Sequence, residues 1–337
     1  MRNSSPCCDA WEQPNLLEIY CVALLMNASE EVDFLDCWYL TGPTAGGKSA
    51  IGLQLAQRID AEILSLDSMA LFRGMDIGTA KPSPAERALV PHHLIDVLDP
   101  SEDSSIANYL EMAAAAVRDI RARGKQPLFV GGTPLYLKGL LRGLTSGPAP
   151  DLDFRRTVEA EVAVIGAAAL HQRLKQVDPL SAARINANDV RRMIRALEVY
   201  KVTGQPISHL QNDFDEGRAA ADCRVFALDW PRAELHARIN RRVDQMFANG
   251  LVAEVEKLLA HHAPLSDTAL QAVGYREVID HLEGKWTLAA AIEKVKVRTR
   301  QFAKRQCTWF RSLSECRMTP LSGALDPQRI ADEIARQ

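Results

Sequence analysis

The chain has 337 residues and a formal net charge of −3, with 47% hydrophobic and 25% charged residues. This length allows one large domain with an insertion, or two domains. The small net charge excludes a chain that is basic throughout, so any nucleic-acid-binding surface has to be a local patch. The composition is that of an ordinary soluble globular protein without a low-complexity tract.

Cysteine usage and hydropathy indicate the cellular context. The seven cysteines, at positions 7, 8, 21, 37, 223, 307 and 316, never form a Cys-x-x-Cys pair, so neither a disulfide framework nor a zinc site is indicated. The apolar stretch from Leu16 to Met26 is too short to span a bilayer and contains Glu18. Asp9 and Glu12 argue against a signal peptide. We therefore expect a cytoplasmic protein without a membrane partner.

Residues 1–33 differ from the sequence that follows. They contain Cys7-Cys8 and scattered acids, and they show no strong hydrophobic period. We interpret them as a poorly ordered extension, or as a translation start placed too early with Met26 as the true start. No function is assigned to them.

Residues 42–49 read Gly-Pro-Thr-Ala-Gly-Gly-Lys-Ser, which fits the phosphate-loop pattern. The preceding run, 34–41, is typical of a buried parallel strand, and residues 50–57 have helical spacing. A strand, a glycine turn and a helix together make an anion site, because backbone N–H groups and the helix N-terminus face the anion. Lys48 is expected to reach the terminal phosphates and Ser49 to bind Mg²⁺.

The phosphate-loop pattern leaves two questions open. It indicates a di- or triphosphate, but not whether that group belongs to ATP or to another phosphorylated substrate. An ordinary glycine turn without a ligand is the alternative.

An acidic residue follows the next predicted strand. Residues 61–66 are β-like and lead into Asp67-Ser68. Because the carboxyl ends of parallel strands face the ligand crevice, Asp67 is expected beside the phosphate loop, where it binds Mg²⁺ or accepts a proton. The alternative is an aspartate that caps the next turn. Residues 71–82, with two glycines and two basic residues, predict a functional loop.

Strands and helices alternate through the rest of this region. Residues 91–100 predict a strand and its exit turn, and His92 and His93 within them are given structural roles because they lack metal-like spacing. Residues 105–123 predict an alanine-rich helix, and residues 126–133 a core strand that ends in a glycine corner. The alternation predicts an α/β fold with a parallel sheet flanked by helices.

Residues 140–205 predict an all-α insertion. They contain no strand signal, whereas Asp178-Pro179 and Asn188-Asp189 are helix-start signals. Arg191, Arg192 and Arg195 lie within about one helical turn and predict a basic patch. A solvated charged face is the alternative interpretation.

The chain then returns to the predicted sheet. Residues 224–231 are strand-like, and the helix predicted over 235–248 carries Arg238, Arg241 and Arg242. Arginines suit a helix beside a phosphate site, because a planar guanidinium pairs with two phosphate oxygens. An ordinary amphipathic helix is the alternative.

The strongest basic stretch is 294–311. It holds seven cations and no acid, with Phe302, Trp309 and Phe310 interleaved, a pattern that suits a nucleic-acid backbone with unstacked bases. The alternative is an amphipathic helix whose aromatic residues face the core. Residues 313–337 are interpreted as a tail with one helix. Residues 34–139 and 206–312 are thus the predicted core.

The chain resembles the tRNA dimethylallyltransferases, also called tRNA isopentenyltransferases, over residues 38–312. The similarity lies in an ordered series of blocks, each weak alone. They are Gly42-Pro-Thr-Ala-Gly-Gly-Lys-Ser49, Asp67-Ser68, Gly74-Met-Asp-Ile-Gly-Thr-Ala-Lys-Pro82, Pro91-His-His-Leu-Ile-Asp96, Gly131-Gly-Thr-Pro-Leu-Tyr136, Asn188-Asp189, Arg195-Ala-Leu-Glu-Val-Tyr200, Val273-Gly-Tyr-Arg276, Ala303-Lys-Arg-Gln306 and Thr308-Trp309.

The resemblance implies a P-loop NTPase-like fold and a transferase with Mg²⁺ present. It implies transfer of a dimethylallyl group from dimethylallyl diphosphate to N6 of adenosine 37, beside the tRNA anticodon, with release of diphosphate. Asp67 then accepts the amine proton, while Lys48 and Arg238 stabilise the leaving group. The diphosphate site comprises Gly42, Pro43, Thr44, Ala45, Gly46, Gly47, Lys48 and Ser49, so the loop does not bind ATP.

The resemblance also implies contacts with the tRNA anticodon stem-loop, whose adenosine must leave its stack to react. These contacts fall on Asp67, Ser68, Met69, Ala70, Thr133, Arg155, Arg191, Arg192, Met193, Ile194, Arg195, Arg276, Lys304, Arg305, Gln306, Trp309 and Arg311. The chain departs from the family at Ala70, where Gln is frequent, and at Arg191. Both departures bear on how base edges are read. We expect a monomer.

Three other functions are weighed against this one. An adenylate isopentenyltransferase would not need the Arg191 patch or the basic stretch 294–311. A small-molecule P-loop kinase would not need the block at 131–136, the helical insertion or the basic C-terminal stretch. A non-catalytic RNA-binding protein would not need Lys48, Ser49 and Asp67 together.

Overall fold

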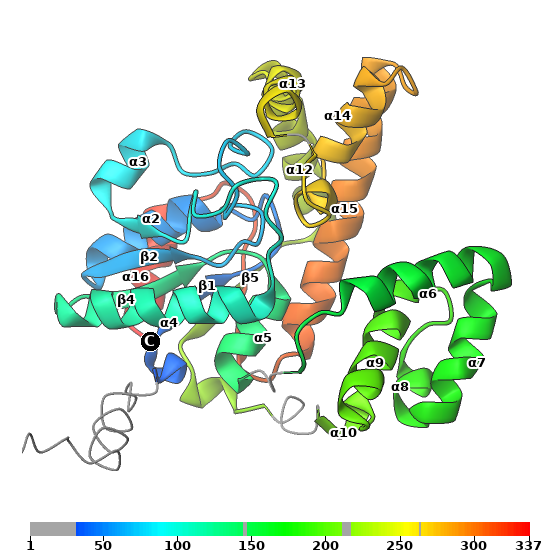
Figure 1. Cartoon of the computed structure of the whole chain (residues 1–337). Coiled ribbons are helices and arrows are strands. Elements are labelled where there is room, and N and C mark those ends of the chain that lie inside the picture. The colour runs from blue at the N-terminus through cyan, green and yellow to red at the C-terminus, as the bar shows by residue number, and fades with distance from the viewer. Residues whose placement is uncertain (1–31, 144–146, 211–216, 263) are drawn as a thin grey trace, which may run out of the picture. The chain divides into compact units, whose positions relative to one another are not determined.

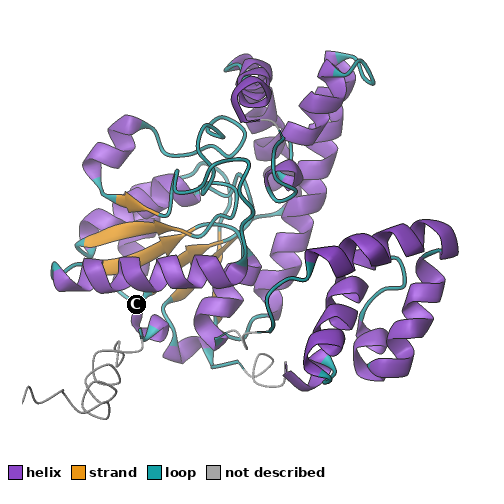
Figure 2. Ribbon diagram, in the orientation of Figure 1, coloured by secondary structure: helices purple, strands orange, loops and turns teal. Residues whose placement is uncertain are grey.

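The computed structural model describes residues 32–143, 147–210, 217–262 and 264–337. The predicted N-terminal extension therefore lies outside the described residues, apart from Val32 and Asp33. The sheet and the helices around it are shown in Figures 1 and 2.

Six strands form a single parallel sheet in the order β3-β2-β4-β1-β5-β6. The predicted α/β parallel sheet is confirmed. β1 lies between β4 and β5, so the phosphate loop that follows it leaves from the middle of the sheet. The strands are β1 (Trp38–Thr41), β2 (Ala61–Ser65), β3 (His92–His93), β4 (Gln126–Val130), β5 (Val225–Asp229) and β6 (Cys316–Pro320).

Helices cover both faces of this sheet (Figure 2). α2 packs on β1, β2 and β4 with α16 beside it, while α4 packs on β2 and β4 with α5 beside it. The core helices are α2 (Lys48–Arg58), α3 (Pro84–Leu89), α4 (Ile106–Ala122), α5 (Pro134–Arg142), α12 (Arg232–Ala248), α13 (Leu251–His262), α14 (Tyr275–Leu282), α15 (Leu288–Ser312) and α16 (Pro327–Ala335). Short 3-10 helices are η1 (Phe34–Asp36), η2 (Ala220–Asp222) and η3 (Ala269–Gln271).

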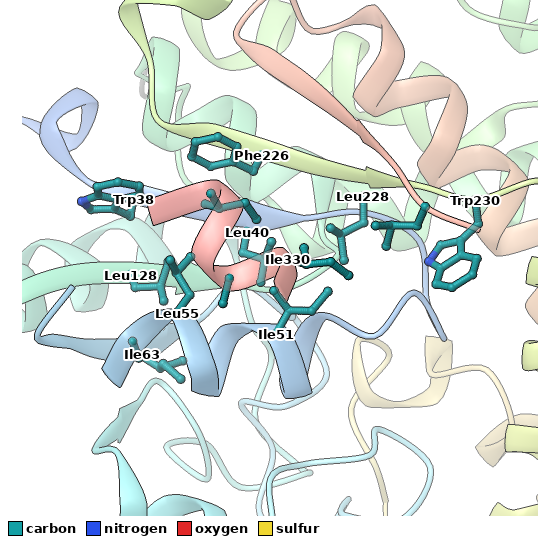
Figure 3. Close-up of a cluster of buried hydrophobic side chains, with 14 of the residues drawn as sticks. Trp38, Leu40, Ile51, Leu55, Ile63, Leu128, Phe226, Leu228, Trp230 and Ile330 are labelled. Carbon is teal, nitrogen blue, oxygen red and sulfur yellow. The ribbon is translucent and has the colours of Figure 1, made fainter. Parts of the chain in front are cut away.

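The main hydrophobic core lies between the sheet and α2 (Figure 3). Leu40 of β1, Leu128 of β4 and Leu228 of β5 meet Ile51 and Leu55 of α2, and each of these five side chains is buried. Burial of apolar surface on this scale is the main stabilising contribution to a domain of this kind. The core therefore fixes the first turn of α2, and with it the end of the glycine loop.

The interpretation of residues 313–337 as a tail is wrong. β6 pairs in parallel with β5, and Ile330 and Ile334 of α16 are buried in the main core. Figure 3 shows Ile330 among the labelled core side chains. The error arose because β6, at the edge of the sheet, reads Cys-Arg-Met-Thr-Pro and is only partly buried, so it has no apolar run.

Two predicted boundaries also differ from the structure. The strand and exit turn are predicted over 91–100, but the strand comprises only His92–His93. It ends there because Leu94 and Asp96 adopt left-handed φ values of 60° and 59°. The core helix α5 continues to Arg142 with Leu140 and Leu141 buried. The helical region accordingly begins after residue 142, later than position 140.

Between the core segments, helices joined by loops make up residues 152–210, and this described part of the chain contains no strand. Leu170, Leu174, Met193 and Leu197 belong to a separate buried cluster of this region. The starts at Asp178 and Asp189 follow the sequence signals, since each side chain accepts a hydrogen bond from the first helical turn. The helices are α6 (Leu152–Ile165), α7 (Ala167–Val177), α8 (Pro179–Arg184), α9 (Val190–Thr203) and α10 (Ile207–Leu210).

Among the described helices, none is both long and apolar enough to cross a lipid bilayer.

The packing of α16 predicts that the C-terminal helix contributes to the stability of the whole core. Ile330→Ala removes a side chain that is 2% exposed and should lower the free energy of unfolding by about 2–5 kcal/mol. Gln328→Ala, on the exposed face of the same helix, is the matched control and should change it by less than about 0.5 kcal/mol. Urea denaturation measures both. Equal midpoints for the two variants would show that α16 is dispensable.

Candidate active site

The glycine loop turns sharply between β1 and α2. Gly42 has a φ of 136°, and a Cβ built there would lie 2.9 Å from the Leu228 carbonyl oxygen, so the position requires glycine. Gly47, with a φ of 95°, precedes the first helical residue, Lys48. The strand, glycine turn and helix that the sequence predicts are therefore present, and the helix N-terminus opens at the loop.

Lys48 folds back over this loop. Its Nζ donates hydrogen bonds to the carbonyl oxygens of Gly42 at 3.0 Å and Pro43 at 2.8 Å. Burial of the ammonium group and the nearby charge of Arg242 lower the pKa of Lys48 to about 8, although Asp67 acts in the opposite direction. The environment thus disfavours the cationic form of Lys48.

Arg238 of α12 braces the other side of the loop. Its Nε donates to the Ala45 carbonyl oxygen at 2.8 Å, and its Cζ lies 4.3 Å from the ring centroid of Trp230. The Trp230 indole N–H donates in turn to Gly46 O at 2.9 Å. Burial, followed by repulsion from Arg241, lowers the pKa of Arg238.

Arg242 is a site residue that the sequence indicated only as one of three arginines on α12. Its Nε is buried and has no hydrogen-bond partner among the described residues, and its Nη2 makes a long contact of 3.4 Å with Thr79 O. Burial lowers its pKa, while Asp67 raises it. A buried guanidinium nitrogen without a hydrogen-bond partner is costly, and such a group is suited to an anionic ligand.

Gln306 connects α15 with the phosphate loop. Its Oε1 accepts a hydrogen bond from the Thr44 N–H at 2.9 Å, and its Nε2 donates to Gly132 O at 2.6 Å. The side chain is 3% exposed. The amide therefore faces inward, where its hydrogen bonds hold the loop and it lines the first cavity, and the contact of Gln306 with RNA stays a prediction.

Asp67 lies at the end of β2, in a cavity that the phosphate loop also lines. Its Oδ1 accepts a hydrogen bond from the Met69 N–H at 2.9 Å. Thr133, at the start of α5, accepts one from the Ser68 N–H at 3.1 Å and thereby joins the two neighbouring strand ends. The structure thus places Asp67 beside the phosphate loop, as the sequence predicts.

The loop over residues 71–82 is held from outside by Glu254 of α13. This carboxylate accepts hydrogen bonds from the backbone N–H groups of Asp76, Ile77 and Gly78 at 3.0, 2.8 and 3.3 Å. Tyr275 donates its hydroxyl to the same carboxylate at 2.7 Å. The loop therefore keeps a fixed position at the rim of the site.

Two cavities meet at this rim. The first, of about 560 Å³, is lined by the phosphate loop from Thr44 to Ala50 and by the arginines of α12. The second, of about 340 Å³, is lined by Ser68, Met69, Thr133 and apolar side chains of α12 and α15. Five residues line both cavities: Thr44, Asp67, Thr79, Arg242 and Phe302.

Comparison with known proteins supports a specific family. The profile of the family described as IPP transferase matches residues 70–313. The tRNA dimethylallyltransferase of Rhodopirellula baltica is 53% identical over 292 residues, which cover 84% of this chain and 87% of that relative. The chain belongs to the IPP transferase family.

Solved structures agree with this assignment. The tRNA isopentenylpyrophosphate transferase of Bacillus halodurans has a TM-score of 0.65 at 39% identity, over 90% of this chain and 95% of that one. A eukaryotic dimethylallyltransferase acting on tRNA has a TM-score of 0.67 at 27% identity, over 84% of this chain and 73% of that one. The resemblance inferred from the sequence blocks is confirmed.

The residues that the sequence assigns to RNA lie in three different settings in this IPP transferase. Lys304, Arg305 and Trp309 are exposed on α15, and Arg276 is exposed on α14. Arg311, also exposed, pairs with Asp229 at 2.7 Å. Ala70, by contrast, is buried and lines the first cavity.

In the helical region, only part of the predicted patch faces outward. Arg191 and Arg192 are exposed at the start of α9. Met193 and Ile194 are 0% and 3% exposed, so a contact of these side chains with RNA is contradicted. The helical period explains the difference, because Arg191 and Arg192 lie on the exposed face of α9, whereas Met193 and Ile194 lie on the face that packs into the buried cluster.

Arg155 and Arg195 are already paired. Both donate to Glu198, which is fully buried, and Arg155 does so through two bonds of 2.8 and 2.9 Å. Burial alone would raise the pKa of Glu198, but the two guanidinium groups and the Asp151 N–H outweigh it and hold that pKa below its usual value. Arg155 therefore braces α6 against α9, whereas the pair of Arg195 with Glu198 lies within α9.

Enclosure of Lys48 predicts pH-dependent anion binding. A bound anion favours the ammonium form of Lys48, so anion binding raises the pKa of Lys48 from about 8. Above about pH 8, Lys48 must therefore take up a proton when the anion binds. Pyrophosphate affinity of the wild type, relative to Lys48→Arg, should fall as pH rises above about 8, approaching tenfold per pH unit. Isothermal titration calorimetry between pH 7 and pH 9.5 checks it. A constant ratio would mean that Lys48 is already charged.

Proposed function

We propose that this IPP transferase moves a dimethylallyl group from dimethylallyl diphosphate to N6 of adenosine 37 in tRNA and releases diphosphate. One observation carries the proposal: Asp67 and Arg242 line both a cavity that contains the phosphate loop and a second cavity that contains Ser68 and Thr133. A donor in the first cavity and an acceptor base in the second would meet at Asp67. The relatives named tRNA dimethylallyltransferase support the choice of substrates.

The first cavity suits the diphosphate. Backbone N–H groups at the start of α2, with Lys48, Arg238 and Arg242, would surround its oxygens. When the allylic C–O bond breaks, its electron pair goes to the diphosphate, so these cations stabilise the charge as it grows. They are preorganised for this, because the contacts of Arg238 and Lys48 to loop carbonyls already fix their positions.

Asp67 is the proposed general base. As the amine nitrogen forms its bond to C1 of the allyl group, its proton passes to the Asp67 carboxylate. The hydrogen bond that Met69 donates to Oδ1 fixes the orientation of this carboxylate. Its place at the meeting of the two cavities puts it beside the reacting atoms.

Magnesium is the proposed cofactor. No group of three potential metal-ligating side chains is found in the described segments, so these residues do not form a metal site made of protein ligands alone. Mg²⁺ instead suits a site with few protein ligands, completed by substrate phosphates and water. The Ser49 hydroxyl, in the first turn of α2, would hold the ion, with Asp67 facing the same cavity. When bound, the ion would neutralise diphosphate charge.

The RNA surface is proposed to include two helices. Lys304, Arg305 and Trp309 on α15 offer cations and an exposed ring for the anticodon loop, and Arg191 and Arg192 on α9 offer a second basic group. One chain carries both cavities, so the proposal needs no second copy and we propose a monomer. Cys223, Cys307 and Cys316 are free thiols, which suits the cytoplasm.

Product analysis tests the function. The protein is incubated with Mg²⁺ and dimethylallyl diphosphate and with either unmodified tRNA or AMP, while a third reaction contains ATP and candidate alcohols. Prenylated adenosine in tRNA alone is expected. Prenylated AMP would favour an adenylate isopentenyltransferase, and phosphate transfer would favour a kinase, so either result rejects the proposal.

The base role of Asp67 predicts a separation of turnover from binding. Asp67→Asn keeps the size of the side chain and its bond to Met69, but it removes the proton acceptor, so single-turnover transfer should fall about 10²–10⁴-fold. The affinity for tRNA should stay within about threefold, measured by filter binding. Asp60→Asn, in the exposed turn before β2, is the matched control. A large loss of tRNA affinity in Asp67→Asn alone would contradict the role.

A further inference from the structure

Phe302 occupies a particular position between the two cavities. It is a partly buried residue of α15 and lines both of them. The other residues shared by the cavities are Thr44, Asp67, Thr79 and Arg242, two of which are charged and two of which carry hydroxyl groups. Phe302 is therefore the single large apolar side chain of the shared region among the described residues.

The reaction requires an alkyl group in this shared region. This step rests on the proposed function, in which the C–O bond breaks beside the phosphate loop and the new N–C bond forms beside Asp67. The carbon that changes partners must lie between the diphosphate and the acceptor nitrogen, in line with both. The rest of the five-carbon unit must then lie against whatever side chains surround this point.

An aromatic ring is suited to this contact. Packing an alkyl group on a ring removes apolar surface of both from water, whereas a charged or hydroxyl-bearing neighbour would lose hydration. One face of the ring also admits positive charge, since Cζ of Arg305 lies 5.9 Å from its centroid. An allylic group that gains positive character as it leaves is compatible with such a face.

The position of the ring is fixed by its helix. On either side of Phe302, Ala303, Gln306 and Val295 of α15 are buried at 1%, 3% and 1% exposure. Gln306 is in addition bonded to the phosphate loop through Thr44. A shift of α15 would break these contacts, so the Phe302 ring is held at a constant distance from the phosphate loop.

We propose that Phe302 determines the chain length of the allylic substrate. Its ring packs on the dimethylallyl group and fills the space that the next isoprene unit of a longer chain would need. Preference for the short substrate then comes from a favourable contact with one chain and a steric clash with the other.

The test compares dimethylallyl and geranyl diphosphate as donors to unmodified tRNA, by the ratio of their kcat/KM values. The wild type should prefer dimethylallyl diphosphate by at least about 100-fold. Phe302→Ala should reduce this ratio by at least about tenfold, through slower transfer from the short donor and faster transfer from the long one. Phe302→Leu should keep most of the preference, because a leucine still fills much of the space.

Gln301→Ala, at an exposed position of the same helix that lines neither cavity, is the matched control and should keep the wild-type ratio. A ratio unchanged in Phe302→Ala, or a wild type that uses both donors equally, overturns the proposal. If Phe302→Ala does not fold by circular dichroism, Phe302→Val replaces it, and its ratio must lie below that of Phe302→Leu. A wild type that prenylates no tRNA rejects the proposed function itself.

Discussion

Positive charge that the protein does not neutralise is the constraint on which the site depends. The side chains of Lys48, Arg238 and Arg242 converge on one glycine turn, and the hydrogen-bond partners that they have are carbonyl oxygens. Burial lowers the pKa of all three. The folded chain thus carries an electrostatic cost that a bound anion would remove, in agreement with the diphosphate site that we propose.

The rest of the fold keeps these cations in place. The main core seats α2 against the sheet, α16 completes that core, β6 extends the sheet beside β5, and α12 carries two of the three cations. Gln306 and Glu254 each hold a loop at the rim through backbone hydrogen bonds. Such fixed dipoles and charges need little rearrangement during reaction, which is the source of electrostatic catalysis.

Local motifs were predicted well, and long-range placement was not. The phosphate loop and Asp67 follow from short patterns whose geometry is determined by neighbouring residues. Met193 and Ile194 were assigned to RNA because they lie inside a family block, although the helical period turns their side chains inward. The pairing of Arg155 with Glu198 joins residues 43 positions apart, and spacing alone gives no signal for it.

A structure of the protein with a non-reactive thio analogue of dimethylallyl diphosphate and an anticodon stem-loop would test the central claim most directly. The account predicts that the diphosphate lies within hydrogen-bond distance of Lys48 and the loop N–H groups, with C1 between the adenine N6 and the loop. The Asp67 carboxylate should then be within reach of N6. A diphosphate bound outside the first cavity, or an adenine that enters without approaching Asp67, would contradict it.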